Sequence, residues 1–291
     1  MSEHASLRGI HLAYERFGDS GTPVVLIMGF GMAGAAWRGQ AALLSVQHRV
    51  VTFDNRGAGR TESQPGVHSM QMYADDTAAL LDHVGFERAH VVGVSMGGMI
   101  AQELVLRHRT RARSLTLIAT HAGGLRSVVP PLRGLQLFLK AQRGNDPTAR
   151  YAAVEELLFP QSYLSSCDRQ VLRDVISSDF GCPSPQKQRL SQLSAVMQHR
   201  TASRLKSLLG LPTLVIQPSH DLLIHPRESE RLARLIPGAR LVRYEETGHG
   251  IIRQHAQKLS EDLLAHFAAA EAGLPEDRGL LANELRSTEA R

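Results

Sequence analysis

Short apolar runs alternate with longer amphipathic segments along the first two-fifths of the chain. Runs with few polar interruptions are typical of strands that are buried on both faces of a sheet. After a first strand at 10–17, we expect such buried strands at 23–28, 48–53, 89–94 and 113–119. Apolar residues at helical spacing lie between them at 69–84 and 97–108. Strands and helices that alternate in this order predict a mostly parallel sheet with right-handed crossovers and flanking helices. On the helix at 69–84, the polar side is expected to carry Asp75, Asp76 and Asp82.

The alternation stops near His121. From 122 to 209 no segment has the pattern of a strand, and breakers such as Pro130-Pro131 separate amphipathic pieces at 132–142 and 150–158. The alternation then returns, with strands expected at 214–217 and 240–244 and helices at 227–236 and 251–270. We therefore expect an α/β core formed by residues 1–121 and 210–273, a helical insertion at 122–209, and a polar tail at 274–291 that frays.

Composition narrows the class of protein. The chain has 291 residues, of which 43% are hydrophobic and 21% charged, enough for a sizeable core and unlike a disordered chain. Two cysteines, Cys167 and Cys182, exclude a disulfide scaffold and a four-cysteine zinc site. One bridge between them and two free thiols both remain open. No export signal and no apolar run of membrane-spanning length is visible, so we expect a cytoplasmic protein without a membrane partner.

The net charge of +5 does not indicate a nucleic-acid partner. The arginines are scattered, and their densest stretch, at 107–113, has no interleaved aromatic residues. Such a stretch is more typical of a solvated helix end than of a basic binding surface. No cluster of His, Cys and Asp has metal-ligand spacing, so no metal or organic cofactor is expected.

A candidate nucleophile, Ser95, lies in the segment Gly93-Val94-Ser95-Met96-Gly97-Gly98, between an expected strand and an expected helix. A serine at such a sharp turn has a strained backbone and an exposed hydroxyl, and flanking glycines allow the chain to turn there. The motif alone recurs by chance, with the serine as a simple helix cap. The strand before it and the helix after it favour a nucleophile.

A serine hydroxyl needs a base, and the base needs a group that orients it. His249 lies between two glycines in the loop after the strand at 240–244, and Asp221 lies in the loop after the strand at 214–217. The other histidines that could compete for the role of base are His121, His220, His225 and His255. The chain order Ser, Asp, His favours Ser95, Asp221 and His249 as a catalytic triad.

The negative charge of a tetrahedral intermediate needs N–H donors that are already in place. One candidate is the backbone N–H of Met96, directly after the nucleophile at a helix N-terminus. The second is the N–H of Phe30, in the glycine-rich loop Met28-Gly29-Phe30-Gly31-Met32 after an expected strand. An ordinary glycine-rich turn is the alternative interpretation of this loop.

Together these segments resemble the α/β-hydrolase fold superfamily, in particular its esterases, lipases and lactonases. The matching pieces are MGFG at 28–31, FDNRGAGRTE at 53–62, GVSMGG at 93–98, SHDLLIHP at 219–226 and TGHG at 247–250. The resemblance covers about 8–121 and 210–270. It implies an α/β-hydrolase fold with a helical cap insertion and the same triad and oxyanion donors. It also implies structural roles for Asp54 and Arg56.

Two positions depart from the family pattern. The oxyanion loop usually begins His-Gly, and here Met28 stands in place of the histidine. The acid loop usually has a glycine some four residues before the acid, and here it reads Gln217-Pro218-Ser219-His220. The first departure bears on the geometry of the oxyanion loop, and the second stiffens the turn before Asp221.

In this fold the insertion forms a cap whose apolar pocket decides what binds. Phe138, Leu158, Phe159 and Met197 are candidate pocket residues, although each could equally pack the cap helices together. Because no concentrated basic pocket is visible, an uncharged ester or lactone fits best. The sequence leaves open a C–C bond hydrolase, an aminopeptidase or amidase, a cofactor-free perhydrolase or haloperoxidase, and a catalytically dead binding protein.

Overall fold

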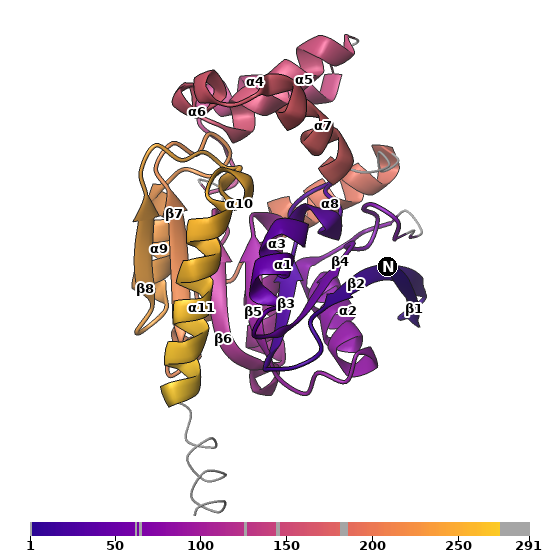
Figure 1. The fold of residues 1–291 in the computed structure, drawn as a ribbon, viewed down its shortest axis with the longest axis vertical. Coiled ribbons are helices and arrows are strands. Elements are labelled where there is room, and N and C mark those ends of the chain that lie inside the picture. Colours follow the sequence, from indigo (N-terminus) through magenta and orange to yellow (C-terminus); the bar gives the residue numbers. More distant parts are fainter. Residues whose placement is uncertain are drawn as a thin grey trace, which may run out of the picture.

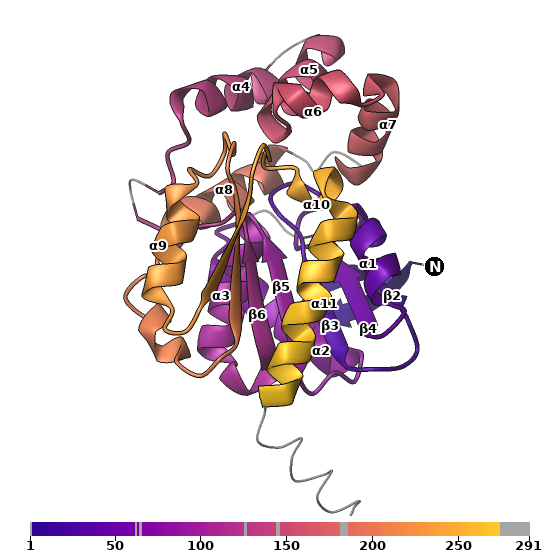
Figure 2. The same ribbon diagram turned by 60° about the vertical axis from the view of Figure 1, so that its left-hand side comes forward.

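An eight-stranded sheet forms the centre of the molecule, with helices on both faces (Figures 1 and 2). The computed structural model describes residues 2–61, 63, 66–124, 127–143, 146–180 and 186–273. The strand order in the sheet is β1-β2-β4-β3-β5-β6-β7-β8. The strands are β1 (Glu3–Leu7), β2 (Ile10–Phe17), β3 (Pro23–Ile27), β4 (Arg49–Phe53), β5 (Ala89–Val94), β6 (Ala112–Ile118), β7 (Thr213–Pro218) and β8 (Arg240–Tyr244).

The sheet is parallel from β4 to β8 in its spatial order, which confirms the predicted mostly parallel architecture. The exception is the first edge, where β1 pairs antiparallel with β2, and β2 pairs antiparallel with β4. Strand β1 was not expected from the sequence. It joins β2 through Arg8 and Gly9, which both have positive φ, 49° and 77°. Two successive residues with positive φ form the tight turn that a two-residue hairpin requires.

Two layers of helices bury the two faces of the sheet. One hydrophobic cluster unites the sheet with α2, α3 and α9, and the other unites it with α1, α10 and α11. Helix α1 was not expected from the sequence. The helices of these layers are α1 (Arg38–Leu44), α2 (Met70–His83), α3 (Met96–Arg107), α9 (Arg227–Leu235), α10 (Ile251–Gln254) and α11 (Ala256–Gly273).

The single long helix expected at 251–270 is wrong, because the chain leaves the helical conformation at His255, where φ is −130° and ψ is 43°. The ring Nε2 of this histidine lies 2.9 Å from the hydroxyl of Thr247, in the loop after β8. The contact occurs at the break that separates α10 from α11.

The chain between β6 and β7 forms helices, as expected, and they lie over the carboxyl-terminal ends of the strands (Figures 1 and 2). The helices α4 to α7 form the outer part, and α8 lies between them and the sheet. A small core of Phe159, Leu164, Leu172 and Ile176 packs inside this segment. The five helices are α4 (Leu132–Arg143), α5 (Pro147–Leu158), α6 (Gln161–Ser166), α7 (Arg169–Phe180) and α8 (Gln186–Gln198).

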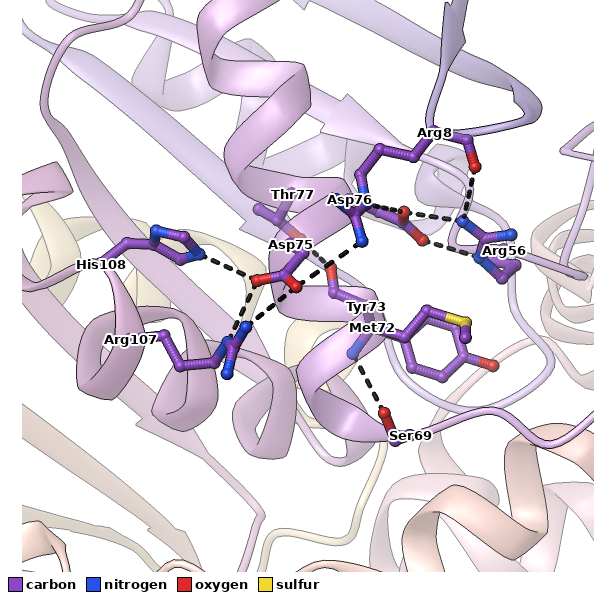
Figure 3. A network of polar contacts seen from close by, with 10 residues as sticks. All are labelled: Arg8, Arg56, Ser69, Met72, Tyr73, Asp75, Asp76, Thr77, Arg107 and His108. Carbon is purple, nitrogen blue, oxygen red and sulfur yellow. Dashed lines mark hydrogen bonds and ion pairs between the residues drawn. The ribbon is translucent and has the colours of Figure 1, made fainter.

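A network of ion pairs ties α2 to the loop after β4 (Figure 3). Arg56 donates from Nε and Nη2 to the two carboxylate oxygens of Asp76, both at 2.8 Å, and Arg8 donates to the same carboxylate at 3.2 Å. Asp76 is buried, so its expected place on the polar side of the helix is wrong. Periodicity could not show this, because the cation that pairs with the buried carboxylate comes from a distant loop.

Three buried histidines predict a loss of stability in acid. Burial lowers the pKa of His121 to about 4, that of His199 to about 3 and that of His266 to about 4. The unfolded chain takes up protons on these rings near pH 6.5, whereas the folded chain does not. The free energy of unfolding should therefore fall as the pH is lowered from about 6.5 toward about 4. Urea unfolding at pH 7.5 and at pH 5 measures the effect.

The variant His266→Phe should show a shallower dependence on pH, because one of the three buried rings no longer titrates. The control is His4→Gln, which replaces a histidine that is exposed rather than buried. Equal unfolding free energies at the two pH values would contradict the burial argument.

Candidate active site

Four polar residues follow four strands that are neighbours in the sheet. Ser95 follows β5, His121 follows β6, Asp221 follows β7 and His249 follows β8. These strands are parallel and adjacent, so their carboxyl-terminal ends meet at one edge of the sheet. The topology therefore brings together residues that lie far apart in the sequence, at the edge where open α/β sheets bind ligands.

Ser95 has a strained backbone, with φ of 56° and ψ of −122°. Its N–H donates to the carbonyl of Ile118 at 2.9 Å, which fixes the turn against β6. A Cβ atom at Gly93 would lie 2.3 Å from the carbonyl oxygen of Gly97, and one at Gly97 would lie 2.1 Å from that of Ile27. Only glycine fits these close approaches. A strained serine between a strand and a helix is the geometry of a nucleophile elbow.

His249 and Asp221 form a buried hydrogen bond. The ring Nδ1 of His249 lies 2.7 Å from Oδ2 of Asp221. The other carboxylate oxygen accepts the N–H groups of Leu223 and Ile224, at 2.7 and 2.9 Å. Three hydrogen bonds thus hold the carboxylate of Asp221 in place. Its bond to Nδ1 orients the imidazole of His249, so that Nε2 is the nitrogen available for proton transfer.

The two candidate oxyanion donors lie beside Ser95. The MGFG loop approaches so closely that a Cβ atom at Gly29 would lie 3.2 Å from Cβ of Ser95. Met96 is the first residue of α3, where the helix dipole favours negative charge. Within the described residues, no hydrogen bond engages the N–H of Phe30 or of Met96. Two donors are thus available for a developing oxyanion.

Two residues that the sequence did not single out hold the oxyanion loop. The amide of Asn55 donates to the carbonyl of Met28 at 2.8 Å, and Gln192 of α8 accepts the N–H of Gly31 at 2.9 Å. Met28 itself is buried. No local sequence signal could have revealed these contacts, because they join segments far apart in the chain.

A cavity of about 850 Å³ lies between the sheet edge and the helices α4, α5, α7 and α8. Ser95 and His249 line it together with the oxyanion loop. All four candidate pocket residues also lie on its wall: Phe138, Leu158, Phe159 and Met197. Most of the other lining side chains are aliphatic or aromatic, as in sites that bind small apolar molecules.

The charged lining of this cavity is cationic. Arg150 of α5, Arg189 of α8 and Arg253 of α10 line it, and no Asp or Glu of the described residues does. The sequence showed no concentrated basic pocket because these arginines come from three separate helices. An anionic group on a bound molecule would therefore meet no carboxylate in the lining.

The segment between β6 and β7 contacts each of the three loops of the site. Gly134 of α4 packs against the acid loop, where a Cβ atom would lie 1.6 Å from the carbonyl oxygen of Leu222. The carbonyl of Leu158 accepts the N–H of Gly250, beside His249, at 2.8 Å. Together with the hydrogen bond from Gly31 to Gln192, these contacts connect the segment between β6 and β7 to all three loops of the site.

The competing histidines other than His121 lie away from the cavity lining. His220 is exposed and contacts the hydroxyl of Ser219 at 2.9 Å, and exposed His225 accepts the N–H of Arg227 at 3.3 Å. His255 contacts Thr247, as described above.

The loop after β4 has contacts that support the fold. The carboxylate of Asp54 accepts the N–H groups of Gly34 and Arg60, at 2.7 and 2.8 Å. Arg56 pairs with Asp76 (Figure 3). Among the described residues, no three His, Cys, Asp or Glu side chains are placed to hold a metal ion, and no helix is long and apolar enough to cross a membrane.

Cys167 is a free thiol at the end of α6. Cys182 lies outside the described residues, as do Glu62 and the expected tail at 274–291.

Comparison with known proteins points to one family. A family model described as the alpha/beta hydrolase fold matches residues 22–256. BpoC of Mycobacterium tuberculosis, which carries the name of a non-heme bromoperoxidase, is 32% identical over 90% of this chain and 100% of its own length. RutD of Azorhizobium caulinodans, which carries the name of a carbamate hydrolase, is 29% identical over 87% of this chain and 93% of its own. The enol-lactonase of Burkholderia xenovorans LB400 has a similar structure, with a TM-score of 0.80 and 25% identity over 91% of this chain and 100% of that one.

The close packing around His249 predicts that Gly250 cannot be enlarged. A Cβ atom at Gly250 would lie 2.4 Å from a ring carbon of Phe159, which is itself buried. The variant Gly250→Ala should therefore lose about 1–3 kcal/mol of unfolding free energy through overpacking. Denaturant unfolding followed by circular dichroism measures the loss.

Gly39 in α1 is the matched control, because a Cβ atom there would meet nothing within 4 Å. Gly39→Ala should be neutral or stabilising, since alanine is the better helix former. Equal stability of Gly250→Ala and Gly39→Ala would show that the loop does not pack as closely as described.

Proposed function

Because this chain belongs to the α/β-hydrolase fold family, we propose that it is a serine hydrolase that cleaves a carboxylic ester or lactone. The observation that carries the proposal is the buried bond of 2.7 Å between His249 and Asp221, since His249 lines the same cavity as the strained Ser95. A hydroxyl, an imidazole and a carboxylate in this order supply a nucleophile, its base and the group that orients the base.

The proposed reaction passes through an acyl-enzyme. His249 accepts the proton of the Ser95 hydroxyl at Nε2 while the hydroxyl oxygen attacks the carbonyl carbon. Asp221 stabilises the imidazolium through Nδ1. His249 then returns the proton to the leaving alcohol as the C–O bond breaks. A water molecule, deprotonated by the same ring, attacks the acyl carbon. The bond from the acyl carbon to the Ser95 oxygen then breaks as the ring returns the proton to that oxygen, which releases the acid and restores Ser95.

The oxyanion of each tetrahedral intermediate would be bound by the N–H groups of Phe30 and Met96. Both donors are held in place before the reaction, Phe30 by the braced MGFG loop and Met96 by the start of α3. Donors that need no rearrangement stabilise the transition state more than the ground state, which is the condition for raising kcat.

We infer that the insertion at 122–209 acts as a cap domain over the core formed by 1–121 and 210–273. Its helices supply the apolar wall of the cavity, including Phe138 of α4 and Leu158 of α5. An acyl chain bound there would leave water, which favours substrates with an apolar acyl part.

The names of the similar proteins support a hydrolase and also leave perhydrolysis as a second candidate reaction. An enol-lactonase and a protein named as a carbamate hydrolase both act, by their names, on acyl compounds. BpoC carries the name of a non-heme bromoperoxidase, and the same triad could form a peracid if hydrogen peroxide replaced water in deacylation. Perhydrolysis is therefore the second candidate, and it uses the same acyl-enzyme.

Ser95 should be essential for both candidates. The variant Ser95→Ala should lose a factor of about 10⁴ or more in kcat toward p-nitrophenyl butanoate and should not be labelled by a fluorophosphonate probe, because no nucleophile remains. Mass spectrometry of the labelled wild type should place the probe on Ser95. Adding hydrogen peroxide and assaying the peracid separates perhydrolysis from hydrolysis.

Ser177 is the control, because it also lines the cavity but lies on α7, away from the strand ends. Ser177→Ala should keep its labelling at Ser95. A wild-type protein that hydrolyses no ester and takes up no probe would refute the proposed function.

The apolar wall predicts a preference among acyl chains. From p-nitrophenyl acetate to the hexanoate, kcat/KM should rise by up to about four-fold per methylene, because burial of one methylene contributes about 0.8 kcal/mol. Initial rates over the series measure this slope. A flat or falling series would show that the acyl chain does not occupy the cavity.

A further inference from the structure

One face of α5 lines the cavity over most of the length of the helix. The lining residues on it are Arg150, Tyr151, Val154, Leu157 and Leu158, whose spacing puts them on one side of an α-helix. The first two residues are polar and the last three are apolar. The cavity wall therefore changes from polar to apolar along α5.

The apolar end of this face lies beside the candidate base. The carbonyl of Leu158, the last residue of α5, accepts the N–H of Gly250 at 2.8 Å, next to His249. Arg150 precedes Leu158 by more than two helical turns, which separates their Cα atoms by about 12 Å along the helix axis. The polar end of this face is thus distant from the base.

The cavity lining along α4 changes in the same way. Gly134, near the start of α4, packs against the carbonyl of Leu222 in the acid loop, whereas Gln142, near its end, is a polar residue of the cavity lining. The Nε of Arg150 donates to the carbonyl of Ala141 at 3.2 Å, so the end of α4 lies beside the start of α5. The two helices therefore place their polar ends together, over the carboxyl-terminal ends of the strands (Figures 1 and 2).

The apolar parts of α4 and α5 lie over the reacting groups. The ring centroid of Phe138 is 6.3 Å from that of Phe30 in the oxyanion loop, and α5 ends at the loop of His249. An acyl chain attached to a carbonyl at Ser95 would thus pass apolar side chains first and the polar end of the cavity last. Arg150 is exposed, so this polar end is in contact with solvent.

The acidic residues of α5 and of its N-cap have partners other than Arg150. Asp146, the N-cap, accepts two N–H groups of the first helical turn. Glu155 pairs with arginines of α7, and Glu156 pairs with Arg133 of α4. Among the described residues, no Asp or Glu lines the cavity or forms an ion pair with Arg150. The cation at the polar end is therefore not neutralised by a carboxylate of this part of the chain.

We propose that Arg150 binds a carboxylate at the far end of the acyl chain, so that the substrate is an ester or lactone whose acyl part is apolar in its middle and anionic at its end. This inference rests on the proposed hydrolase function, in which the reacting carbonyl lies at Ser95. The Nε of Arg150 is bonded to a backbone carbonyl, and its two Nη groups donate to the carboxylate. An anionic substrate thereby replaces the uncharged one that the sequence favoured.

The distance along α5 sets the length of the acyl chain. An extended chain advances about 1.2 Å per bond, so about ten bonds cover the distance of about 12 Å from Leu158 to Arg150, and the long arginine side chain shortens the gap. Acyl chains of about eight to ten carbons therefore reach the guanidinium. A carboxylate on a six-carbon chain would lie beside Val154 and Leu157, where an unpaired charge is unfavourable.

Matched pairs of esters test this assignment. The mono-p-nitrophenyl esters of adipic, suberic and sebacic acid are compared with p-nitrophenyl hexanoate, octanoate and decanoate, which have a methyl group in place of the carboxylate. For the wild type, kcat/KM should be lower for the carboxylated ester of the six-carbon pair. It should be about three- to five-fold higher for that of the eight- or ten-carbon pair, mainly through KM. Hydrolysis of the neutral esters without such a preference at any chain length would leave the proposed function standing and overturn the inference.

Two substitutions at Arg150 separate its charge from its packing. Arg150→Gln keeps an amide that can donate to the carbonyl of Ala141 but removes the positive charge, so the preference for the longer carboxylated esters should fall to about one. Arg150→Lys restores the charge without the planar pair of donors, so part of the preference should return. An unchanged preference in Arg150→Gln would show that another group binds the carboxylate, and the inference would be wrong.

Lys140 of α4 supplies the matched control, because it is exposed and lies outside the cavity lining. Lys140→Gln removes one positive charge from the same pair of helices and should leave the preference unchanged. If Lys140→Gln lowers the preference as much as Arg150→Gln does, the effect comes from the overall charge of the insertion and not from binding at Arg150, which contradicts the inference.

A binding measurement decides the case where no ester is hydrolysed. Monomethyl suberate and methyl octanoate are titrated calorimetrically into Ser95→Ala and into the same variant with Arg150→Gln. Monomethyl suberate should bind about three- to five-fold more tightly than methyl octanoate to Ser95→Ala, and this difference should vanish when Arg150 is also replaced. That result supports the role of Arg150 even if the proposed function fails. Equal binding of the two esters, or a difference that survives Arg150→Gln, overturns it.

Discussion

The parallel pairing of β5, β6, β7 and β8 is the constraint on which the candidate site depends. Each strand ends at the same edge, and the loop that follows it carries one of the four residues Ser95, His121, Asp221 and His249. Parallel strands need crossover connections, so residues that meet at this edge come from distant parts of the sequence. An antiparallel partner among these strands would have put one of the four residues at the opposite edge, out of reach of the others.

Much of this arrangement could be predicted, because the signals are local. The strands at 89–94 and 240–244 were predicted with the bounds that the structure shows, since both segments are short and rich in residues that favour strands. The order of Ser95, Asp221 and His249 in strand-end loops followed from the same signals. The glycines at 93 and 97 could also be interpreted, because a sharp turn between strand and helix requires them.

The parts that were not predicted depend on contacts between distant segments. The helical spacing predicts that Asp76 lies on the polar side of its helix, but in the structure it is buried and pairs with Arg56 and Arg8. The break in the helix at His255 could not be predicted from a proline or a glycine, because neither residue type occurs at that point. The cationic lining of the cavity combines arginines of α5, α8 and α10, which only the folded chain brings to one wall. In each case, the residues that determine the structure lie outside the short stretch of sequence over which hydrophobic periodicity is measured.

The contacts between the helices over the site and the loops beneath them set a limit on how this protein can be modified. Gly134 lies against the carbonyl of Leu222, Leu158 bonds to Gly250, and Gln192 bonds to Gly31. The insertion therefore helps to hold the loops of the candidate site in place. A chimera that takes its upper helices from a relative must supply equivalent partners at these three points, or the transplanted segment will change turnover as well as specificity.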